Sequence, residues 1–327
     1  MRTLVTGATG FTGGHLARAL LAGGDEVRVL VRRRDARADA LAAIGAELCE
    51  GDLSNRVCLA SATRGVDVVY NIAAIYREAG VGHDAYETVN ATAVGWIVEA
   101  AATSGVRRVV HCSTVGVHGD VERPPAGEEA PLRPGDEYQR SKLRGEEVAR
   151  AAAARTGVEL VVARPSGIYG PGDRRLLKLF RGVARRRFVI LGSGEIFYHL
   201  TYVTDLAEGF RLCGTVAGAA GRTYILAGPD VTRLNELVGL IADEAGVAPP
   251  SVRLPVWPFW MAGAVCEAVC VPLRIEPPIY RRRVDFFTKS RAFDIARARA
   301  ELGYAPRVAL RDGIRRTLAW YREQEWL

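Results

Sequence analysis

The sequence is poor in the residues from which metal sites and disulfide frameworks are built. Its 327 residues include only five histidines and six cysteines, and no two cysteines form a Cys-x-x-Cys pair. Cys266 and Cys270 lie four residues apart in an apolar stretch, which suits packing better than metal ligation. These spacings argue against a zinc site and predict free thiols in a reducing compartment, with no bound metal.

The sequence also lacks an uninterrupted apolar run of the roughly 20 residues that a membrane-spanning helix needs. The most apolar segment, residues 255–275, is broken by Pro258, Glu267 and Pro272. We expect a buried helix of a smaller lobe there; the alternatives are an apolar wall for a substrate and a patch that contacts a membrane surface. No signal peptide is recognised before the first expected strand, which predicts a cytoplasmic protein.

Signatures of nucleic-acid binding are missing too, although the chain is basic. The formal net charge is +7, and arginine triplets stand at residues 32–34, 185–187 and 281–283. A basic balance suits nucleic acid, anionic lipid or a phosphorylated small molecule, but no RNA-binding motif, zinc-finger spacing or basic tail accompanies it. We therefore expect a small-molecule substrate and no nucleic-acid partner. The triplets are either solvated faces or contacts for phosphate.

The chain does contain a glycine turn at its very start. Leu4 and Val5 form a short apolar run, Gly7, Gly10 and Gly13 follow at three-residue spacing, and a helical pattern then covers residues 15–21. Strand, glycine turn and helix in this order are what a dinucleotide site requires. The glycines permit the tight turn, the close approach of a pyrophosphate, and close packing of helix on strand.

Strands and helices alternate through the first half of the chain. Apolar strand patterns are expected at residues 27–31, 47–50, 66–72, 108–112 and 160–164, and helices at 88–103 and 138–155. This alternation predicts an α/β protein with a doubly wound parallel sheet. We expect a Rossmann domain over residues 1–165 and a smaller C-terminal substrate lobe over 166–327, with roughly 201–228 returning to the main domain. Lobe helices are expected near 235–245 and 311–321.

Tyr138 and Lys142 are the residues with the clearest chemical meaning. Four residues apart on a helix, their side chains share one face, so the phenol and the ammonium point into the same cleft. The ammonium stabilises a phenolate, and the lowered tyrosine pKa that this predicts would suit Tyr138 to moving a proton on or off a secondary hydroxyl. Ser113 and Thr114, at the end of an expected strand, supply hydroxyl groups upstream of this pair.

With these pieces together, the chain resembles the extended short-chain dehydrogenase/reductase superfamily over nearly its full length. The matching segments are residues 6–13 (cofactor turn), 51–53 (adenine side), 113–119 (hydroxyl-bearing strand end), Tyr138 with Lys142, 164–172, 202–206 and 301–306. The resemblance implies hydride transfer between a nicotinamide and a carbon bearing oxygen.

The resemblance also implies a role for individual residues. Tyr138 would exchange the hydroxyl proton, Thr114 would hold the substrate oxygen with Ser113 as second candidate, and Lys142 would bind the nicotinamide ribose. The expected cofactor residues are Gly7, Thr9, Gly10, Phe11, Gly13, Arg32, Asp52, Leu53, Ala73, Lys142 and Pro165.

Arg32 decides the expected cofactor. Members that bind NAD carry an acidic residue after the second strand, where it accepts hydrogen bonds from the ribose. This chain has Arg32, Arg33 and Arg34 there, and dihydroflavonol-reductase-like relatives place an arginine at the first of these positions for the 2′-phosphate. We expect NADP, with NAD beside a solvated arginine as the alternative.

Two branches of the superfamily compete for the substrate. Nucleotide-sugar epimerases and dehydratases retain NAD, whereas 3β-hydroxysteroid-dehydrogenase-like and dihydroflavonol-reductase-like members turn cofactor over on bulky alcohols or ketones. Next to Ser166, Gly167 replaces the asparagine that the sugar-nucleotide enzymes commonly use, and Tyr198 stands near their diphosphate-binding arginine. The three expected substrate contacts are therefore Ser166, Gly167 and Tyr198, and the dehydrogenase-like branch is favoured. A non-catalytic dinucleotide sensor is the third alternative.

The resemblance predicts a homodimer as well. Relatives often pair through the two helices that here would be residues 88–103 and 138–155. The alanines between residues 149 and 154 would permit a close approach, although they equally suit packing on the protein's own sheet.

Overall fold

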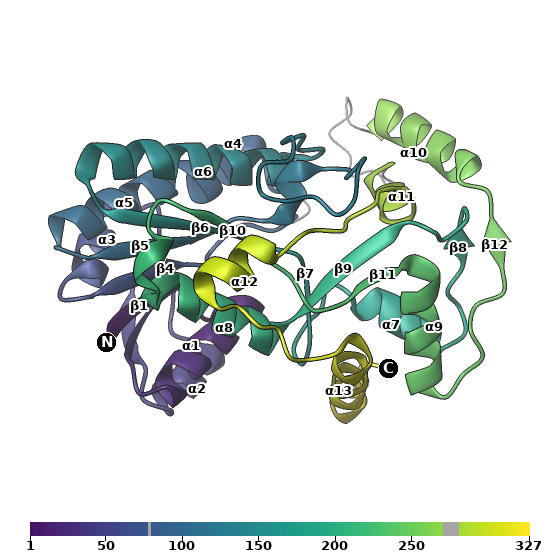
Figure 1. Cartoon of the computed structure of the whole chain (residues 1–327), viewed down its shortest axis with the longest axis horizontal. Helices are drawn as coiled ribbons and strands as arrows, with labels where there is room; N and C mark the ends of the chain where they lie inside the picture. Colours follow the sequence, from purple (N-terminus) through teal and green to yellow (C-terminus); the bar gives the residue numbers. More distant parts are fainter. Residues whose placement is uncertain (78–79, 271–280) are drawn as a thin grey trace.

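The computed structural model of the chain describes residues 1–77, 80–270 and 281–327. Its largest element is a parallel sheet of seven strands in the order β10-β6-β5-β4-β1-β2-β3 (Figure 1). The strands are β1 (Arg2–Thr6), β2 (Glu26–Val31), β3 (Glu47–Glu50), β4 (Val68–Asn71), β5 (Arg108–Cys112), β6 (Glu159–Pro165) and β10 (Thr223–Leu226). The sheet confirms the expected doubly wound Rossmann fold, because the strand order reverses direction at β1.

Helices cover both faces of this sheet. One face carries α3 (Arg56–Thr63), α5 (Ala93–Thr103) and α6 (Glu137–Thr156); the other carries α1 (Phe11–Ala22), α2 (Ala36–Ala42), α8 (Val203–Thr215) and α12 (Ala296–Leu302). Neighbouring strand residues point to opposite faces, so Leu4 packs under α3 and α5 whereas Val5 packs under α1 and α8. Buried apolar runs such as 68–70 therefore serve two cores at once.

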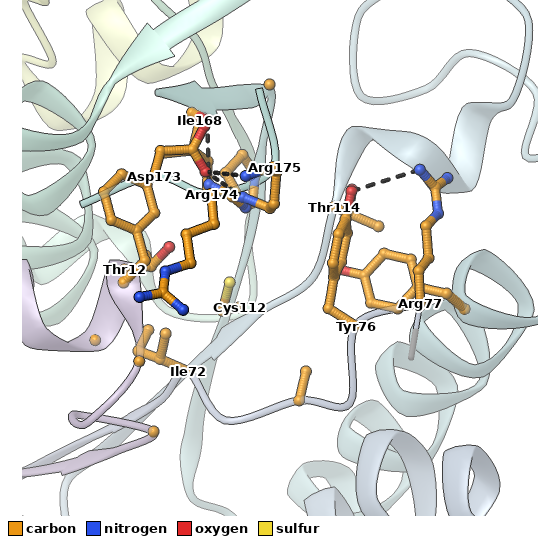
Figure 2. A pocket seen from close by; sticks show the side chains of 18 of the residues that line it. Thr12, Ile72, Tyr76, Arg77, Cys112, Thr114, Ile168, Asp173, Arg174 and Arg175 are labelled. Carbon is orange, nitrogen blue, oxygen red and sulfur yellow. Dashed lines mark hydrogen bonds and ion pairs between the residues drawn. The ribbon is translucent and has the colours of Figure 1, made fainter. Parts of the chain in front are cut away.

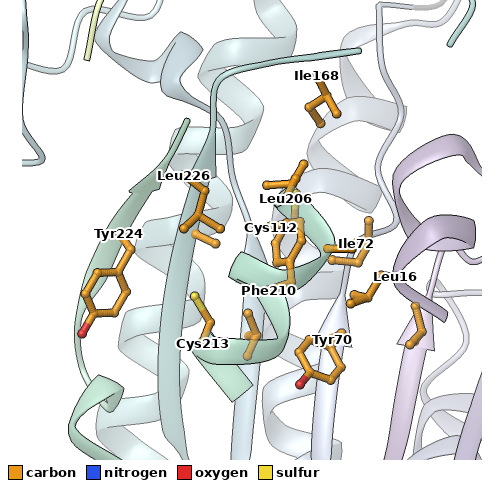
Figure 3. Packing of buried hydrophobic residues seen from close by; sticks show 14 of the residues in the cluster. Leu16, Tyr70, Ile72, Cys112, Ile168, Leu206, Phe210, Cys213, Tyr224 and Leu226 are labelled. Atoms are coloured by element: carbon orange, nitrogen blue, oxygen red, sulfur yellow. The ribbon is translucent and has the colours of Figure 1, made fainter. Parts of the chain in front are cut away.

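Figure 3 shows, at close range, the core on the face of the sheet that α1 and α8 cover. Leu206, Phe210 and Cys213 of α8 lie against Tyr70 of β4 and Tyr224 of β10. Strand β10 is hydrogen-bonded to β6 in parallel, with Thr223 opposite Val162. Residues 203–226 are thus part of the large sheet and its helix layer, although they follow the first lobe segment in the sequence.

The smaller lobe is built around a three-stranded sheet and a two-stranded one. The strands are β7 (Gly167–Tyr169), β9 (Phe197–Tyr202) and β11 (Val231–Arg233) in the first sheet, and β8 (Ile190–Leu191) with β12 (Arg253–Leu254) in the second. The helices are α7 (Leu177–Ala184), α9 (Leu234–Ala245), α10 (Trp257–Cys270), α11 (Arg281–Thr288) and α13 (Leu310–Glu323). A third apolar cluster joins α7, α9 and α13 to β9.

The helix expected over residues 88–103 has an irregular start. The chain forms α4 (His83–Glu87), then a π-helical turn (Thr88–Thr92), and only then α5. Asn90 explains the irregularity, because its side chain accepts a hydrogen bond from the Ile75 amide at 2.8 Å and donates to the Ser141 hydroxyl at 3.0 Å. Gly145 lets α6 approach this turn, since a Cβ there would lie 2.2 Å from the Asn90 carbonyl oxygen.

The helices α5 and α6 pack on each other within the chain. Ala149 and Ala152 are buried against this partner and the sheet, so these alanines of α6 serve the protein's own core. The outward side carries Glu99 between Arg56 and Arg155. The homodimer stays a prediction.

The expectation of a buried helix within residues 255–275 is wrong for the part that the structure describes. Residues 257–270 form α10, but most of its large side chains are exposed. Pro258 does not interrupt the helix because it lies in the first turn, where its missing N–H group has no carbonyl partner to lose. Residues 271–275 lie outside the described residues. No helix within the described ranges is long and apolar enough to cross a bilayer.

Candidate active site

A cleft of about 1930 Å³ lies between the large sheet and the smaller lobe. It opens at the carboxyl ends of β1, β4, β5 and β6, where ligands of doubly wound sheets bind. The volume exceeds that of an ordinary small-molecule pocket, so it has room for a dinucleotide and a second ligand together. All the predicted cofactor residues line it: Gly7, Thr9, Gly10, Phe11, Gly13, Arg32, Asp52, Leu53, Ala73, Lys142 and Pro165.

The glycine turn has the shape of a phosphate cradle. Gly7 adopts a φ of 69°, and a Cβ there would lie 2.7 Å from the Ala73 Cα. A Cβ on Gly13 would lie 2.3 Å from the Gly7 carbonyl oxygen. The turn therefore tolerates no side chain at either position. Gly10 precedes α1, whose first amides face the cleft with no acidic side chain in that turn. This free helix N-terminus fits a pyrophosphate.

The adenosine end of the cleft is basic. Arg32, Arg33 and Arg37 all line it, and the Arg37 guanidinium donates to the Thr9 carbonyl at 3.1 Å. The two nearby acids are occupied: Asp35 caps α2 and Asp52 accepts from the Ser54 amide and hydroxyl. Hydrogen bonds from Ser54 hold the pKa of Asp52 below its ordinary value. The sequence reasoning missed Arg37, which lies in the first turn of α2, five residues after Arg32.

Tyr138 lies in the first turn of α6, which Asp136 begins by accepting a hydrogen bond from the Gln139 amide at 2.8 Å. The Tyr138 side chain is half-buried and lines the cleft. Its ring meets the Tyr76 ring edge-on at 4.8 Å, and the Arg77 guanidinium lies 5.7 Å from the Tyr138 ring centroid. Burial raises the pKa of Tyr138, while the positive charge of Arg77 opposes that rise. The lowered pKa expected from the Tyr138–Lys142 spacing is therefore wrong for this state, because the cost of burying the phenolate outweighs the nearby positive charge. The phenol is therefore protonated at neutral pH in this state.

Lys142 stands one turn further along α6 and is 1% exposed. Its Nζ has no hydrogen-bond partner among the described residues, and burial lowers its pKa. An ammonium left without partners in a buried position is costly. A ligand with hydroxyl groups in the cleft would supply the missing acceptors, which fits the ribose of a nicotinamide nucleotide.

Thr114 and Ser113, the two candidate hydroxyl groups, have different surroundings. Thr114 is half-buried in the cleft wall, and its Oγ1 accepts from the Gly116 amide at 3.0 Å. The Thr114 hydroxyl hydrogen is still available to a substrate oxygen. Ser113 is 1% exposed and its hydroxyl donates to Glu146 at 2.5 Å. The geometry therefore favours Thr114 over Ser113 as the substrate contact.

Behind Ser113 lies a buried ionic network that the sequence reasoning missed. The Arg164 guanidinium donates to both Glu146 carboxylate oxygens, at 2.9 and 2.7 Å, and it also contacts the His118 ring at 3.2 Å and the Glu128 carbonyl oxygen at 3.1 Å. Burial alone would raise the pKa of Glu146, but Arg164 and the Ser113 hydroxyl outweigh it and hold the pKa at about 2. This network ties α6, β5 and β6 together directly behind the catalytic candidates.

The substrate side of the cleft is aromatic and cationic. Figure 2 shows Arg77 beside Tyr76, and Arg174 and Arg175 beside Asp173. Arg77 pairs with Asp136 at 2.6 Å and Arg175 with Asp173 at 2.8 Å. The other lining residues of this side include Lys178, Phe188, Phe286, Phe287, Lys289, Arg291, Trp320 and Trp326. None of these was predicted, because they come from loops and lobe helices that no sequence motif marks.

Ser166, Gly167 and Tyr198, the predicted substrate contacts, all line the cleft. A Cβ on Gly167 would lie 2.6 Å from Leu200 Cδ2, so an asparagine does not fit there without movement of Leu200. The Tyr198 hydroxyl donates to the Phe286 carbonyl. A guanidinium is nevertheless close, because Arg291 lies 6.0 Å from the Tyr198 ring centroid. The Ser166 hydroxyl has no partner among the described residues.

Comparison with known proteins agrees with this site. A sequence model of the NAD dependent epimerase/dehydratase family matches residues 3–227. The chain belongs to this family, and thereby to the extended short-chain dehydrogenase/reductase superfamily, and is an enzyme of this kind.

Three similar proteins show the range of the family. A 3beta-hydroxysteroid-dehydrogenase/decarboxylase (isoform 2) of Arabidopsis thaliana is 30% identical over 82% of this chain, and the chain spans about half (50%) of that relative's length. A 2-alkyl-3-oxoalkanoate reductase of Stenotrophomonas maltophilia is 28% identical, with 98% of this chain and 99% of the relative covered. The structure of MoeE5 with UDP-glucose and NAD is 25% identical, has a TM-score of 0.78, and matches 99% of this chain and 100% of its own.

Proposed function

We propose that the chain transfers hydride between NADP(H) and the secondary alcohol or ketone of a bulky, partly apolar substrate. The observation that carries the proposal is the position of Tyr138, half-buried in the cleft between the glycine cradle and the aromatic lobe wall. A bound nicotinamide supplies or accepts the hydride. The chain's own residues bind and orient the two ligands and move the proton.

The proton step follows from the surroundings of Tyr138. Its raised pKa keeps the phenol protonated at neutral pH, so in the direction of ketone reduction it can donate a proton to the forming alkoxide oxygen. The Thr114 hydroxyl would hold that oxygen by a hydrogen bond. Lys142 would bind the ribose hydroxyls, and its ammonium would stabilise the phenolate that remains on Tyr138.

The lobe wall supports a substrate with a large apolar part. Phe188, Phe286 and Phe287 face the cleft together with Trp320 and Trp326. Two relatives point the same way by name, one to a steroid alcohol and the other to a 3-oxo acid. The missing amide at Gly167 removes an anchor for a sugar nucleotide.

A nucleotide-sugar epimerase or dehydratase remains the second candidate, and the cleft's cations favour it. Arg174, Lys178 and Arg291 line the cleft without an acidic partner among the described residues. They would bind a diphosphate, or the carboxylate of an acidic substrate such as a 3-oxo acid.

The nucleotide that the protein carries through purification separates the two candidates. The proposal predicts a largely empty site that then binds NADPH in titration, because a reductase exchanges its cofactor in each turnover. Denaturing the protein and identifying the released nucleotide by mass spectrometry measures this. Stoichiometric retained NAD would instead assign the chain to the epimerase or dehydratase group.

A second experiment tests whether the cations of the cleft bind a carboxylate. Turnover is compared for ketones with an apolar skeleton, each supplied as the free acid and as its methyl ester.

Replacing Arg32 or Arg37 with alanine should weaken the binding of NADPH much more than the binding of NADH. Each guanidinium would contact the 2′-phosphate that NADH lacks, so we expect the Kd for NADPH to rise about tenfold or more and that for NADH to change little. Fluorescence titration of both nucleotides measures the effect. Arg34→Ala is the matched control, because Arg34 pairs with Asp39 and is not a cleft residue. Equal losses for both nucleotides would show that neither arginine reads the phosphate.

A further inference from the structure

The helix α10 stands at the outer end of the smaller lobe, beside α11 and away from the large sheet (Figure 1). Of its described residues, only Gly263 is buried. Trp257, Met261, Val265 and Val269 follow each other at four-residue spacing and are 70%, 48%, 59% and 57% exposed. Residues four apart lie on one side of a helix, so they form a continuous apolar stripe in contact with water.

The rest of the helix has few polar side chains to contact water. Phe259 and Trp260 are also exposed. The structure describes every residue of α10, and Glu267 is the one charged residue among them. Glu267 is neutralised by Arg281, whose Nε lies 2.7 Å from the carboxylate. A helix that is apolar around its circumference is normally found in a protein core or in lipid. In the described structure α10 is in neither, so this surface needs an occupant.

We propose that α10 docks the protein on an anionic lipid surface. Fourteen residues of helix measure about 21 Å, which is short of a bilayer's hydrocarbon thickness, so α10 would lie in the interface rather than cross it. Exposed tryptophans such as Trp257 and Trp260 suit the headgroup level, where an amphipathic ring meets both lipid and water.

Charge distinguishes lipid from a second copy of the chain as the occupant. Arg253 is exposed just before α10 and has no acidic partner among the described residues, whereas the charge of Arg281 is already paired with Glu267. A second copy would bring the same unpaired Arg253 and the same net charge of +7 to the contact. An anionic bilayer complements Arg253 and this net charge, since each basic residue near such a surface adds to the attraction.

The docked helix would also bring the cleft near the lipid. α11 packs beside α10 and contributes Phe286 and Phe287 to the cleft wall. An apolar substrate dissolved in the bilayer would then have a short path into the site. The docking itself does not depend on which reaction the site performs.

Sedimentation with vesicles tests the docking. We expect the full chain to sediment with phosphatidylcholine vesicles that contain phosphatidylserine, and less with phosphatidylcholine alone. Val265→Asp should weaken binding about tenfold or more, because a charge enters the apolar stripe. Arg253→Glu should weaken binding about fivefold or more, and only to the anionic vesicles. Raised salt should reduce that part of the binding.

Matched controls come from the other end of the molecule. Val57 is 79% exposed on α3 and Arg64 follows that helix, so Val57→Asp and Arg64→Glu make the same chemical changes outside the cleft and outside α10. Both control variants should bind vesicles like wild type, and all four variants should have the same melting temperature as wild type. The proposal is overturned if wild type fails to sediment with the anionic vesicles, or if Val57→Asp loses as much binding as Val265→Asp. Light scattering that shows self-association removed by Val265→Asp would assign the surface to a second copy instead.

Discussion

Tyr138→Phe should lower turnover by about 10²- to 10⁴-fold, which is the usual contribution of a positioned acid or base. The ring stays, and with it the edge-on contact with Tyr76 at 4.8 Å and the neighbouring Arg77. Only the hydroxyl that exchanges the proton is lost. The affinity for the nucleotide should therefore change by no more than about twofold, since an ordinary hydrogen bond contributes little net free energy. Steady-state kinetics and nucleotide titration measure the two quantities separately.

Tyr224→Phe is the control for removing a tyrosine hydroxyl. Tyr224 lies on β10 outside the cleft and donates to Glu301 at 2.8 Å. Its variant should turn over like wild type. If Tyr138→Phe kept comparable turnover, the assignment of the proton step to Tyr138 would fail. A protein with no turnover on any substrate, in which Tyr138→Phe left its biological output unchanged, would support the sensor alternative.

The pH dependence of ketone reduction follows from the same group. Burial raises the pKa of Tyr138, so the acid form needed for proton donation persists through neutral pH and is lost only at alkaline pH. The rate of reduction should therefore be flat near neutrality and fall on the alkaline side.

Local patterns identified the residues on the glycine-turn side of the cleft because that side is built from contiguous segments. The glycine turn follows one strand and begins one helix, and the Tyr138–Lys142 pair lies on a single helix, so spacing alone brings their side chains together. The strands at 47–50 and 108–112 have the predicted bounds. Residues 108–112 are buried throughout, as expected of a strand inside a parallel sheet, whereas 47–50 form the edge strand and are only partly buried.

On the lobe side of the cleft the sequence indicated only Ser166, Gly167 and Tyr198, because the other lining residues come from distant parts of the chain that converge there. Arg77 follows β4, whereas Arg175 precedes α7, yet both guanidinium groups lie within 5.7 Å of the Tyr76 ring centroid. No periodicity marks such a meeting. The choice between Ser113 and Thr114 likewise depended on Glu146, which lies 33 residues after Ser113 and reaches it only through the packing of α6 on the sheet.

The environment of α10 could not be read from composition either. An apolar helical segment has the same residues whether it is buried or exposed. Because such segments are usually buried, the sequence alone favours burial. The structure differs because the apolar clusters of the lobe are completed by α7, α9 and α13, which leaves α10 outside them.

Glu146→Ala should be among the most destabilising single changes, at about 3–5 kcal/mol of unfolding free energy. It leaves Arg164, which is 3% exposed and cannot lose its proton, without a countercharge. Arg164→Met should cost less, because Glu146 keeps Arg150 at 2.9 Å and the Ser113 hydroxyl, and can also take up a proton. The double variant Glu146→Leu with Arg164→Met should recover much of the loss, since apolar side chains of similar volume replace both buried charges.

The same network predicts acid sensitivity of defined sign. The pKa of Glu146 is about 2 in the folded protein, below its ordinary value of 4.5, so the folded state favours the carboxylate. Its contribution is present above about pH 4.5 and is lost as pH falls toward 2, to a total of about 3 kcal/mol. Urea unfolding at a series of pH values measures this. Glu146→Ala should lack that component, whereas Arg150→Ala, which removes a half-exposed partner, should keep it and lose about 1 kcal/mol or less. If Glu146→Ala and Arg164→Met destabilised equally and the wild-type pH slope persisted in both, the buried pair would not be what holds β5, β6 and α6 together behind Thr114.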